Sequence, residues 1–292
     1  MGKPMLEEAK PFVKWAGGKR QLLDELTKGL PVFEDYHEPF IGGGALFFRL
    51  EAMGRIKTAY LSDSNEDLIN TYSVIKNEIF ELMAELALPH YANNEIAYYK
   101  IRASRPTSKI QRAARFIYLN KTAFNGLYRV NSKGGFNVPF GRYTNPKILD
   151  SQNLLLVHRA LQKDELYYGD FTVVLKNAKR GDLIYFDPPY APISKTSNFT
   201  GYTKDGFGES EQKKLLRAYK ELDSRGCFVL LSNSYSDLIS ELYAEFEPEV
   251  VHANRMINCK AEGRGKIKEL IVRNWEPKIA QRKFLEEIVA TN

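Results

Sequence analysis

The chain has 292 residues, 43% hydrophobic and 27% charged, which is typical of one large or two moderate globular domains and excludes disordered, collagen-like and coiled-coil proteins. No apolar run approaches the roughly 18 residues of a membrane span, no signal-peptide core begins the chain, and two cysteines without metal spacing form no disulfide framework. We therefore expect a cytoplasmic protein without membrane or metal, and the net charge of +6 is by itself only a weak indication of a polyanionic partner.

Strand-like and helix-like patterns alternate along most of the chain. Strands are predicted at residues 36–40, 58–61, 166–168, 183–186, 227–231, 249–252 and 269–272, and helices at residues 45–53, 66–76, 171–179, 209–225 and 237–246. This alternation predicts the α/β fold class, with helices on the faces of a largely parallel sheet. The ligand site of such a sheet lies beyond the carboxyl ends of its strands.

The N-terminal motif, residues 12–20, has the glycines and lysine of a phosphate-binding loop but not its spacing. Lys14 stands where the first glycine should be, and Arg20 replaces the Ser or Thr that holds magnesium. Nucleotide hydrolysis is therefore not expected. Trp15, beside two glycines and Lys19, is better suited to flank a ligand that bears a carboxylate, with Lys19 as its countercharge.

A glycine loop, residues 40–45, follows the first predicted strand and precedes a helix. Gly42 and Gly44 would let the backbone approach a ligand closely, but Phe47 occupies the place of the third glycine of a dinucleotide fingerprint. Asp63 ends the next strand, where an acidic residue binds ribose hydroxyls. The pair predicts an adenosine-containing ligand without a pyrophosphate.

Residues 77–149 interrupt the alternation. Helices are predicted at residues 95–103 and 110–120, followed by a Gly-, Asn- and aromatic-rich stretch with a hairpin around residues 131–135. From Lys100 to Leu149 the chain has eleven basic residues and no acidic one, which leaves 31 basic against 36 acidic residues elsewhere. We therefore predict a nucleic-acid-reading domain at residues 77–149 that splits a catalytic core formed by residues 1–76 and 150–292.

The sequence Asp187-Pro188-Pro189-Tyr190 directly follows an apolar predicted strand. The prolines fix the backbone direction and remove two N–H donors, so the loop offers mainly acceptors. The Asp187 carboxylate and the Pro188 carbonyl could accept both hydrogens of an exocyclic amino group, and Tyr190 could stack on the ring that carries it. Because Asp187 is expected at a loop tip, its removal is expected to leave the fold intact.

In this order, these motifs resemble those of Dam-type DNA adenine N6 methyltransferases. The resemblance covers Phe12 to about Asn274 and includes residues 169–171 and two stretches of the insertion, residues 124–129 and 136–143, that are similar to the GATC-reading segment of that family. It implies a seven-stranded, mostly parallel, Rossmann-like methyltransferase sheet with an inserted helical and hairpin DNA-recognition domain. It also implies S-adenosylmethionine as methyl donor and adenine in double-stranded DNA, within GATC, as acceptor.

The resemblance also assigns roles residue by residue. Its catalytic residues are Asp187, Pro188 and Tyr190, and its donor-binding residues are Trp15, Lys19, Phe40, Gly42, Gly44, Asp63, Asp170, Phe171 and Asp187. Its DNA-binding residues are Lys14 and Arg129 for guanines, Asn125, Leu127 and Pro139 for the other base pairs, Phe124 as a wedge in the base stack, Arg142 for a phosphate, and Tyr143. Phe124 stands where part of the family has tyrosine, which removes a hydroxyl contact but not the wedge.

The implied reaction moves the methyl group directly to a base that is flipped out of the duplex. The residues leave other interpretations open. An amino methyltransferase acting on cytosine N4, RNA adenine or a protein glutamine would share the amino-group chemistry, and a catalytically silent DNA-binding protein would share the basic insertion. A nicotinamide oxidoreductase is disfavoured by the missing third glycine. The family includes modification enzymes, so a partner restriction nuclease is a further expectation.

Overall fold

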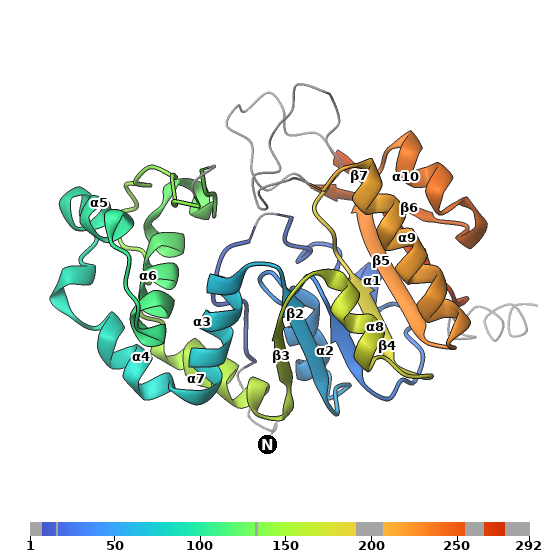
Figure 1. The fold of residues 1–292 in the computed structure, drawn as a ribbon, viewed down its shortest axis with the longest axis horizontal. Helices are drawn as coiled ribbons and strands as arrows, with labels where there is room; N and C mark the ends of the chain where they lie inside the picture. Colours follow the sequence, from blue (N-terminus) through green and yellow to red (C-terminus); the bar gives the residue numbers. More distant parts are fainter. Residues whose placement is uncertain (1–7, 16, 132–133, 191–206, 255–265, 278–292) are drawn as a thin grey trace, which may run out of the picture.

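The computed structural model describes residues 8–15, 17–131, 134–190, 207–254 and 266–277. Its centre is a seven-stranded sheet of order β3-β2-β1-β4-β5-β7-β6 (Figure 1). The strands are β1 (Tyr36–Glu38), β2 (Ala59–Asp63), β3 (Glu165–Tyr168), β4 (Leu183–Phe186), β5 (Phe228–Ser234), β6 (Glu249–Asn254) and β7 (Lys266–Arg273). All pairs from β3 to β5 are parallel, and β7 runs antiparallel to both its neighbours. The predicted seven-stranded, mostly parallel sheet is confirmed.

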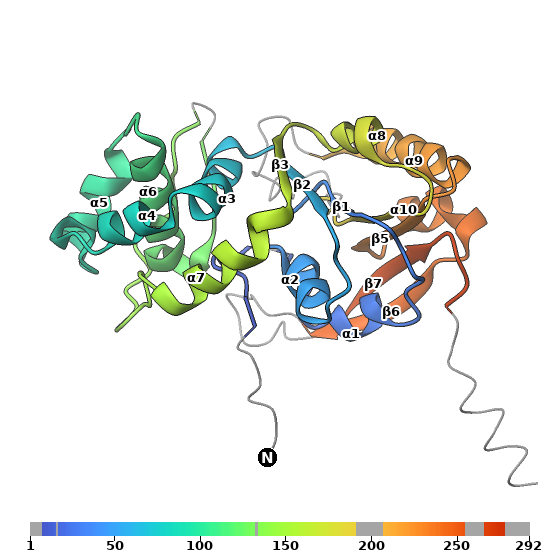
Figure 2. The same cartoon turned by 90° about the horizontal axis from the view of Figure 1, so that it is seen from below.

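Side chains of the inner strands alternate between two hydrophobic clusters, as the pleat of a strand requires. In β4, Leu183 and Tyr185 belong to one cluster, and Ile184 and Phe186 to the other. Both faces are covered by helices, with α1 (Leu23–Thr27) and α2 (Ala45–Ala52) on the face opposite α8 (Val174–Asn177) and α9 (Glu209–Ser224) (Figure 2). Because all four β4 side chains are buried, the strand directs only its end towards solvent.

The chain between β2 and β3 contributes the helices at the β3 edge of the sheet (Figure 1). They are α3 (Glu66–Asn77), α4 (Ile79–Leu86), α5 (Glu95–Ala103), α6 (Lys109–Thr122) and α7 (Ser151–Ala160). The helices predicted at residues 95–103 and 110–120 are confirmed, and α4 and α7 are additional. Within this group, Arg112 of α6 forms ion pairs with Glu66 and Asp67 of α3, at 2.9 and 2.7 Å. No helix of the described residues combines the length and apolar composition of a membrane span.

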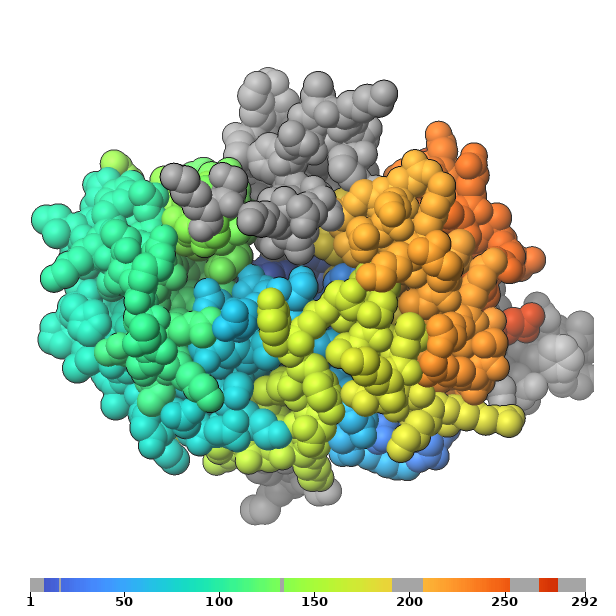
Figure 3. All heavy atoms as spheres, viewed as in Figure 1, coloured from blue at the N-terminus to red at the C-terminus, as the bar shows by residue number. Residues whose placement is uncertain are grey.

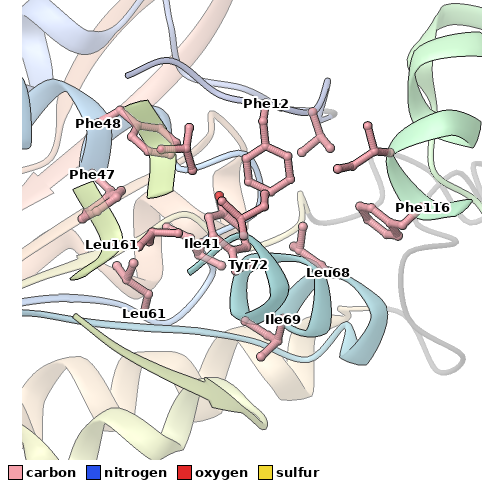
Figure 4. Packing of buried hydrophobic residues seen from close by; sticks show 14 of the residues in the cluster. Phe12, Ile41, Phe47, Phe48, Leu61, Leu68, Ile69, Tyr72, Phe116 and Leu161 are labelled. Carbon is pink, nitrogen blue, oxygen red and sulfur yellow. The ribbon is translucent and has the colours of Figure 1, made fainter. Parts of the chain in front are cut away.

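The sheet and these helices share one hydrophobic core. Phe116 of α6 and Tyr72 of α3 belong to the same cluster as Phe47 of α2 (Figure 4). Phe12, from the N-terminal motif, packs edge to face on Tyr72 with ring centroids 4.8 Å apart. The N-terminal motif is thereby fixed between the sheet and α6, next to the strand ends.

Element ends differ from the prediction where local chemistry stops an element. β1 ends at Glu38 because Pro39 has no N–H to donate to a ladder. The helix predicted at residues 171–179 is a 3-10 turn (Phe171–Val173) followed by the short α8. The helix predicted at residues 237–246 is α10 (Asp237–Leu242) followed by a 3-10 turn (Ala244–Phe246).

Asp164, directly before β3, is a buried carboxyl group with few partners. Its Oδ1 accepts the N–H of Ala59 at 2.9 Å, and its Oδ2 has no hydrogen-bond partner among the described residues. Burial raises the pKa of Asp164 from 3.8 to about 7. Between pH 3.8 and about 7, the folded protein therefore keeps the Asp164 proton while the unfolded chain has released it. The free energy of unfolding consequently falls as the pH rises through this range.

Asp164→Asn is expected to remove this loss, because the amide stays neutral and keeps the acceptor for Ala59. Urea unfolding at about pH 5 and pH 8 should show a difference in unfolding free energy that is smaller in the variant by ~1–3 kcal/mol. Asp182→Asn is the matched control, since contacts with His37 and backbone N–H groups lower the pKa of Asp182 despite its burial. Equal pH dependence of the wild type and Asp164→Asn would contradict the assignment.

Candidate active site and DNA interface

Three carboxylates lie at the carboxyl ends of neighbouring parallel strands: Glu38 ends β1, Asp63 ends β2, and Asp187 follows β4. This is the edge at which parallel α/β sheets form their ligand sites. The surface is hollowed between the green helical segment and the yellow and orange part that carries α9, with blue N-terminal residues at the bottom (Figure 3). The predicted residues Asp63 and Asp187 therefore lie at the edge where the ligand site of such a sheet is expected.

Lys19 of the N-terminal motif forms an ion pair with Asp187, with 2.6 Å between Nζ and Oδ1. The lysine is only 5% exposed. Burial alone would lower its pKa, but Asp187, Tyr190 and Glu269 together raise it above the usual range. Burial raises the pKa of Asp187, and Lys19 opposes that increase. The ammonium group is therefore charged, and its nearest anionic partner in the structure is the carboxylate of the Asp187-Pro188-Pro189-Tyr190 sequence.

Tyr190 joins this pair to a second buried carboxyl group. Its hydroxyl accepts a hydrogen bond from Lys19 Nζ at 3.1 Å and donates one to Glu269 Oε1 at 2.5 Å. Lys19 Nζ also lies 4.7 Å from the centroid of the Tyr190 ring. Glu269 was not among the predicted site residues, because its place in a predicted strand gives no sign that β7 pairs with β5 and brings this side chain to Tyr190.

The two prolines of the motif are supported from α9 and β5. Gln212 donates to the Pro189 carbonyl at 3.5 Å and accepts from the amide of Asn233 at 3.1 Å. Both amide side chains are fully buried. Pro188 lies between Pro189, whose carbonyl is bound by Gln212, and Asp187, whose carboxylate is bound by Lys19. These contacts fix the position of the Pro188 carbonyl relative to the Asp187 carboxylate. Gln212 and Asn233 were not among the predicted site residues, because a sequence does not show that two amide side chains are buried against each other.

The glycine loop, Trp15 and Asp63 come together as the sequence predicts. Asp63 Oδ2 accepts the N–H of Gly42 at 3.1 Å. Gly42 has φ +46, and a Cβ there would lie 2.6 Å from the Trp15 ring; Gly44 has φ +70, and its Cβ would lie 2.9 Å from the Tyr72 hydroxyl. Only glycine therefore fits at either position. The loop holds Trp15 and the Asp63 carboxylate on the same side of the sheet.

Phe40, the first residue of the glycine loop, lies against Phe171, which Asp170 precedes. The rings of Phe40 and Phe171 stack with centroids 5.5 Å apart, and Phe171 is 3% exposed. The N–H of Gly169 donates to the main-chain carbonyl of Asp63 at 3.1 Å, which fixes the β3 end against the β2 end. The three predicted residues are thus adjacent, with a buried Phe171 stacked on a partly buried Phe40, and Asp170 caps the start of a 3-10 turn.

The strand-end carboxylates suit a cationic ligand. Burial raises the pKa of Glu38 well above its ordinary value, a hydrogen bond from Tyr36 opposes this, and Asp187 raises the pKa further. A cation bound nearby would therefore stabilise the ionised form of Glu38. Burial also raises the pKa of Asp63 to about 6. S-adenosylmethionine carries sulfonium and ammonium cations, and its ribose hydroxyls can donate to a carboxylate. The residues present therefore fit this donor, and Glu38, which the sequence interpretation missed, belongs to the group; its signal was a strand-end acid next to the glycine loop.

The raised pKa of Asp63 predicts how donor binding depends on pH. Ribose hydroxyls bind best to the ionised carboxylate, so affinity for S-adenosylmethionine should fall as the pH drops through about 6. Calorimetric titration should show a decrease of about tenfold per pH unit below the midpoint when one proton is linked to binding. Asp63→Asn should bind more weakly and without this dependence. The same pH profile in wild type and variant would assign the proton to another group.

Asn120 of α6 joins two segments that carry predicted DNA-binding residues. Asn120 is fully buried, donates to the carbonyls of Lys14 and Gly126, and accepts the N–H of Lys14 at 2.8 Å. It thereby joins the N-terminal motif to the 3-10 turn Phe124–Gly126, where Phe124 is 43% exposed. Lys14 Nζ lies 4.4 Å from the Tyr143 ring centroid. Asn120 was not predicted, because a polar residue within a helical pattern carries no signal of such a tie.

The predicted hairpin is present as far as the structure describes it. Val130 and Phe136 form an antiparallel bridge, and the tip, residues 132–133, lies outside the described residues. Arg129 donates from Nε to Asn137 Oδ1 at 2.8 Å, and Asn137 donates its N–H to the Arg129 carbonyl at 3.0 Å. Asn137, on the second arm of the hairpin, thus holds the side chain of Arg129, which lies on the first arm.

The remaining predicted DNA contacts differ in exposure. The Pro139 carbonyl accepts the N–H of Phe124 at 2.9 Å, and Asn125 occupies the left-handed region with φ +55. Leu127 is partly buried against the core. The Arg142 side chain is 77% exposed and lies 3.7 Å from Glu95. The structure therefore brings the predicted residues to one region, with Arg142 towards solvent and Leu127 partly inside.

Comparisons with known proteins agree with this geometry. The chain matches the family model of the D12 class N6 adenine-specific DNA methyltransferases over residues 15–257, a range that includes Trp15, Asp63 and Asp187. It is 44% identical over 289 residues to the Type II methyltransferase M.MjaIII of Methanocaldococcus jannaschii, which covers 92% of this chain and 100% of that protein. It is 45% identical over 276 residues to the Type II methyltransferase M1.LlaDCHI of Lactococcus lactis subsp. cremoris, covering 91% and 95%. It is 35% identical over 280 residues to the DNA adenine methylase of Salmonella typhi, covering 94% and 98%. The family resemblance expected from the motifs is confirmed, and the chain belongs to the D12 class N6 adenine-specific DNA methyltransferases.

Proposed function

We propose that this DNA adenine methyltransferase moves the methyl group of S-adenosylmethionine to N6 of an adenine within duplex GATC. The observation that carries the proposal is that Asp187 and Tyr190, after β4, share one sheet edge with Asp63 and the glycine loop, after β2 and β1, because β1 pairs in parallel with both β2 and β4. Two substrates can thus meet at one sheet edge. Holding two reactants in line can contribute roughly 7–11 kcal/mol to a reaction that needs no covalent intermediate.

Asp187, Pro188 and Tyr190 form the acceptor site of the proposal. The adenine is flipped out of the duplex and stacks on the Tyr190 ring. Its N6 lone pair is conjugated with the ring and is a poor nucleophile. The Asp187 carboxylate and the Pro188 carbonyl accept the two N6 hydrogens, and these bonds strengthen as the nitrogen becomes tetrahedral. The site therefore stabilises the transition state more than the bound base.

Donor binding is assigned to residues around the glycine loop. When bound, S-adenosylmethionine supplies an activated methyl group on its sulfonium. Asp63 accepts the ribose hydroxyls, and Gly42 and Gly44 allow close approach of the backbone. Trp15, Lys19, Phe40, Asp170, Phe171 and Asp187 complete the proposed set. Its support is their adjacency at the ends of β1, β2, β3 and β4.

Sequence reading is assigned to residues 77–149 as an inserted recognition domain between core segments 1–76 and 150–292. Lys14 and Arg129 contact guanines, and Phe124 enters the base stack. Asn125, Leu127 and Pro139 contact the other base pairs, and Arg142 and Tyr143 bind near the backbone. The exposure of Phe124 and the Asn120 tie that places Lys14 beside it support this assignment. Guanine is the base that arginine recognises best in the major groove.

A partner restriction nuclease is part of the proposal. Two of the relatives are named Type II methyltransferases, and a modification enzyme of that kind protects the sites that its nuclease cuts. This role requires methylation of every target site and not of a subset. Complete protection of a GATC-containing plasmid is therefore the expected outcome in the experiment below.

The experiment is incubation of unmethylated plasmid with protein and S-adenosylmethionine, followed by digestion with GATC nucleases that differ in their sensitivity to adenine methylation. We expect resistance to the nuclease that adenine methylation blocks and cleavage by the one that requires it. Mass analysis of the nucleosides should give N6-methyladenine. N4-methylcytosine would replace the proposal by the related amino methyltransferase, methyladenine outside GATC would change only the target, and tight DNA binding without product would identify a silent binding protein.

A further inference from the structure

Lys19 occupies the position that the proposed mechanism assigns to the adenine amino group. Its ammonium lies 2.6 Å from Asp187 Oδ1 and 4.7 Å from the centroid of the Tyr190 ring. These are the carboxylate that accepts an N6 hydrogen and the ring on which the base stacks. An incoming amino group must therefore compete with this lysine for the same acceptor.

Glu269 is a second carboxyl group within the same network. Since β7 runs antiparallel to β5, Glu269 pairs with Ser234 at the carboxyl end of β5, beside the catalytic loop. It is 3% exposed; Oε1 accepts from the Tyr190 hydroxyl, and Oε2 has no hydrogen-bond partner among the described residues. A buried oxygen without a partner is energetically unfavourable, so Oε2 is an acceptor suited to a further donor.

The Lys19 ammonium is paired with Asp187, and the Tyr190 hydroxyl links it to a second carboxylate, Glu269. The Tyr190 hydroxyl contacts both Lys19 Nζ and Glu269 Oε1. A buried cation that loses its partner is strongly destabilised, and it stays in place unless another anion receives it. Ser232, which donates to Asp187 Oδ1 at 3.3 Å, is neutral and offers no such charge. Among these neighbours, Glu269 is the anion that can take over.

We propose that Lys19 is a movable occupant of the amino-group site, and that Glu269 is the positioning residue that fixes Tyr190 and receives the ammonium when adenine enters. The inference rests on the proposed function and adds a residue and a specificity step to it. A base with an exocyclic amino group replaces the ammonium at Asp187 as a hydrogen-bond donor. A base that lacks this group leaves Asp187 with Lys19 and is rejected.

The test uses a double-mutant cycle with Glu269→Gln and Lys19→Met. The glutamine keeps the shape and an acceptor for the Tyr190 hydroxyl but removes the charge. In the Lys19 background, we expect Glu269→Gln to lower the single-turnover rate about tenfold or more, because the ammonium cannot leave Asp187. In the Lys19→Met background, the same substitution should change the rate by less than about threefold. Equal losses in both backgrounds would overturn the movable-lysine role.

A binding measurement supplies a readout besides activity. GATC duplexes carrying adenine or unsubstituted purine at the target position differ only in the 6-amino group, and S-adenosylhomocysteine replaces the donor so that no turnover occurs. Wild type should bind the adenine duplex more tightly, and Glu269→Gln should lose most of that preference. An unchanged preference would overturn the inference.

Two controls keep these outcomes separate from other failures. Thermal unfolding of each variant identifies those that do not fold. If a variant does not fold, the 15Nζ resonance of Lys19 in the wild-type protein tests the inference instead. That resonance should shift on addition of the adenine duplex and not of the purine duplex, and no shift with either would overturn the inference. Absence of N6-methyladenine with wild-type protein would instead refute the proposed function. Methylation without coupling between Glu269 and Lys19 would refute only the present inference.

Discussion

Asp187→Asn is expected to reduce methyl transfer by about 10²–10³-fold, the usual effect of removing one charged contact to a developing transition state. The amide keeps a neutral acceptor for Lys19 but no longer offers a charged acceptor to the adenine amino group. The measurement is the single-turnover rate with saturating DNA and donor. Affinity for S-adenosylmethionine, followed by calorimetry, should fall by a smaller factor, because Asp63 and the glycine loop of the proposed donor site remain. Near-normal turnover would exclude Asp187 as the acceptor of the N6 hydrogen.

Asp187→Ala is expected to have a second effect that the sequence did not indicate. The sequence predicts an intact fold after this substitution, but the structure shows Asp187 as the partner of a lysine that is 5% exposed. Removing one member of a buried pair typically costs about 3–5 kcal/mol. Asp187→Ala should therefore unfold at lower denaturant concentration. The double variant Asp187→Ala/Lys19→Met should regain stability but not activity, which separates the two roles of the carboxylate.

The sheet could be predicted because its signals are local. Residues 183–186 are apolar without interruption, and β4 occupies this range. Gly42 and Gly44 mark a close approach that the structure places against Trp15 and Tyr72. The α/β alternation then determines at which edge such loops meet. Fold class, sheet and the region of the site follow from patterns that each lie within a few residues.

The missed residues depend on pairings between distant parts of the chain. Asn120 meets Lys14 across 106 residues, and Glu269 meets Tyr190 across 79. A single sequence shows that these side chains are polar but not that they are buried together. The position of Glu269 also depends on the antiparallel direction of β7, which brings the first half of that strand to the carboxyl end of β5. Helix α7 was missed although Asp150 caps it by accepting the N–H of Asn153, because the predicted domain boundary falls there.

Substitutions of Arg129 and Arg142 can distinguish recognition of the DNA sequence from attraction to the DNA backbone. The Arg129 guanidinium is held through Nε by Asn137, and its Nη edge carries the donors that a bidentate contact to guanine O6 and N7 requires. Arg129→Ala should therefore weaken binding to the correct site by about 1–3 kcal/mol and relax discrimination at that base pair only. Asn137→Ala should give a smaller loss at the same base pair, because the guanidinium remains but is less well oriented.

Arg142→Ala is the matched control, since it removes the same charge from an exposed side chain and keeps a Cβ at a position with φ +53. A phosphate contact carries no sequence information, so binding should weaken alike at correct and incorrect sites, and the salt slope should fall by about one. The measurement is binding to GATC and to its single-base variants across a salt series. Because both variants lose one positive charge, charge alone cannot explain a difference between them. Indistinguishable profiles would mean that residues 124–143 attract DNA without reading it.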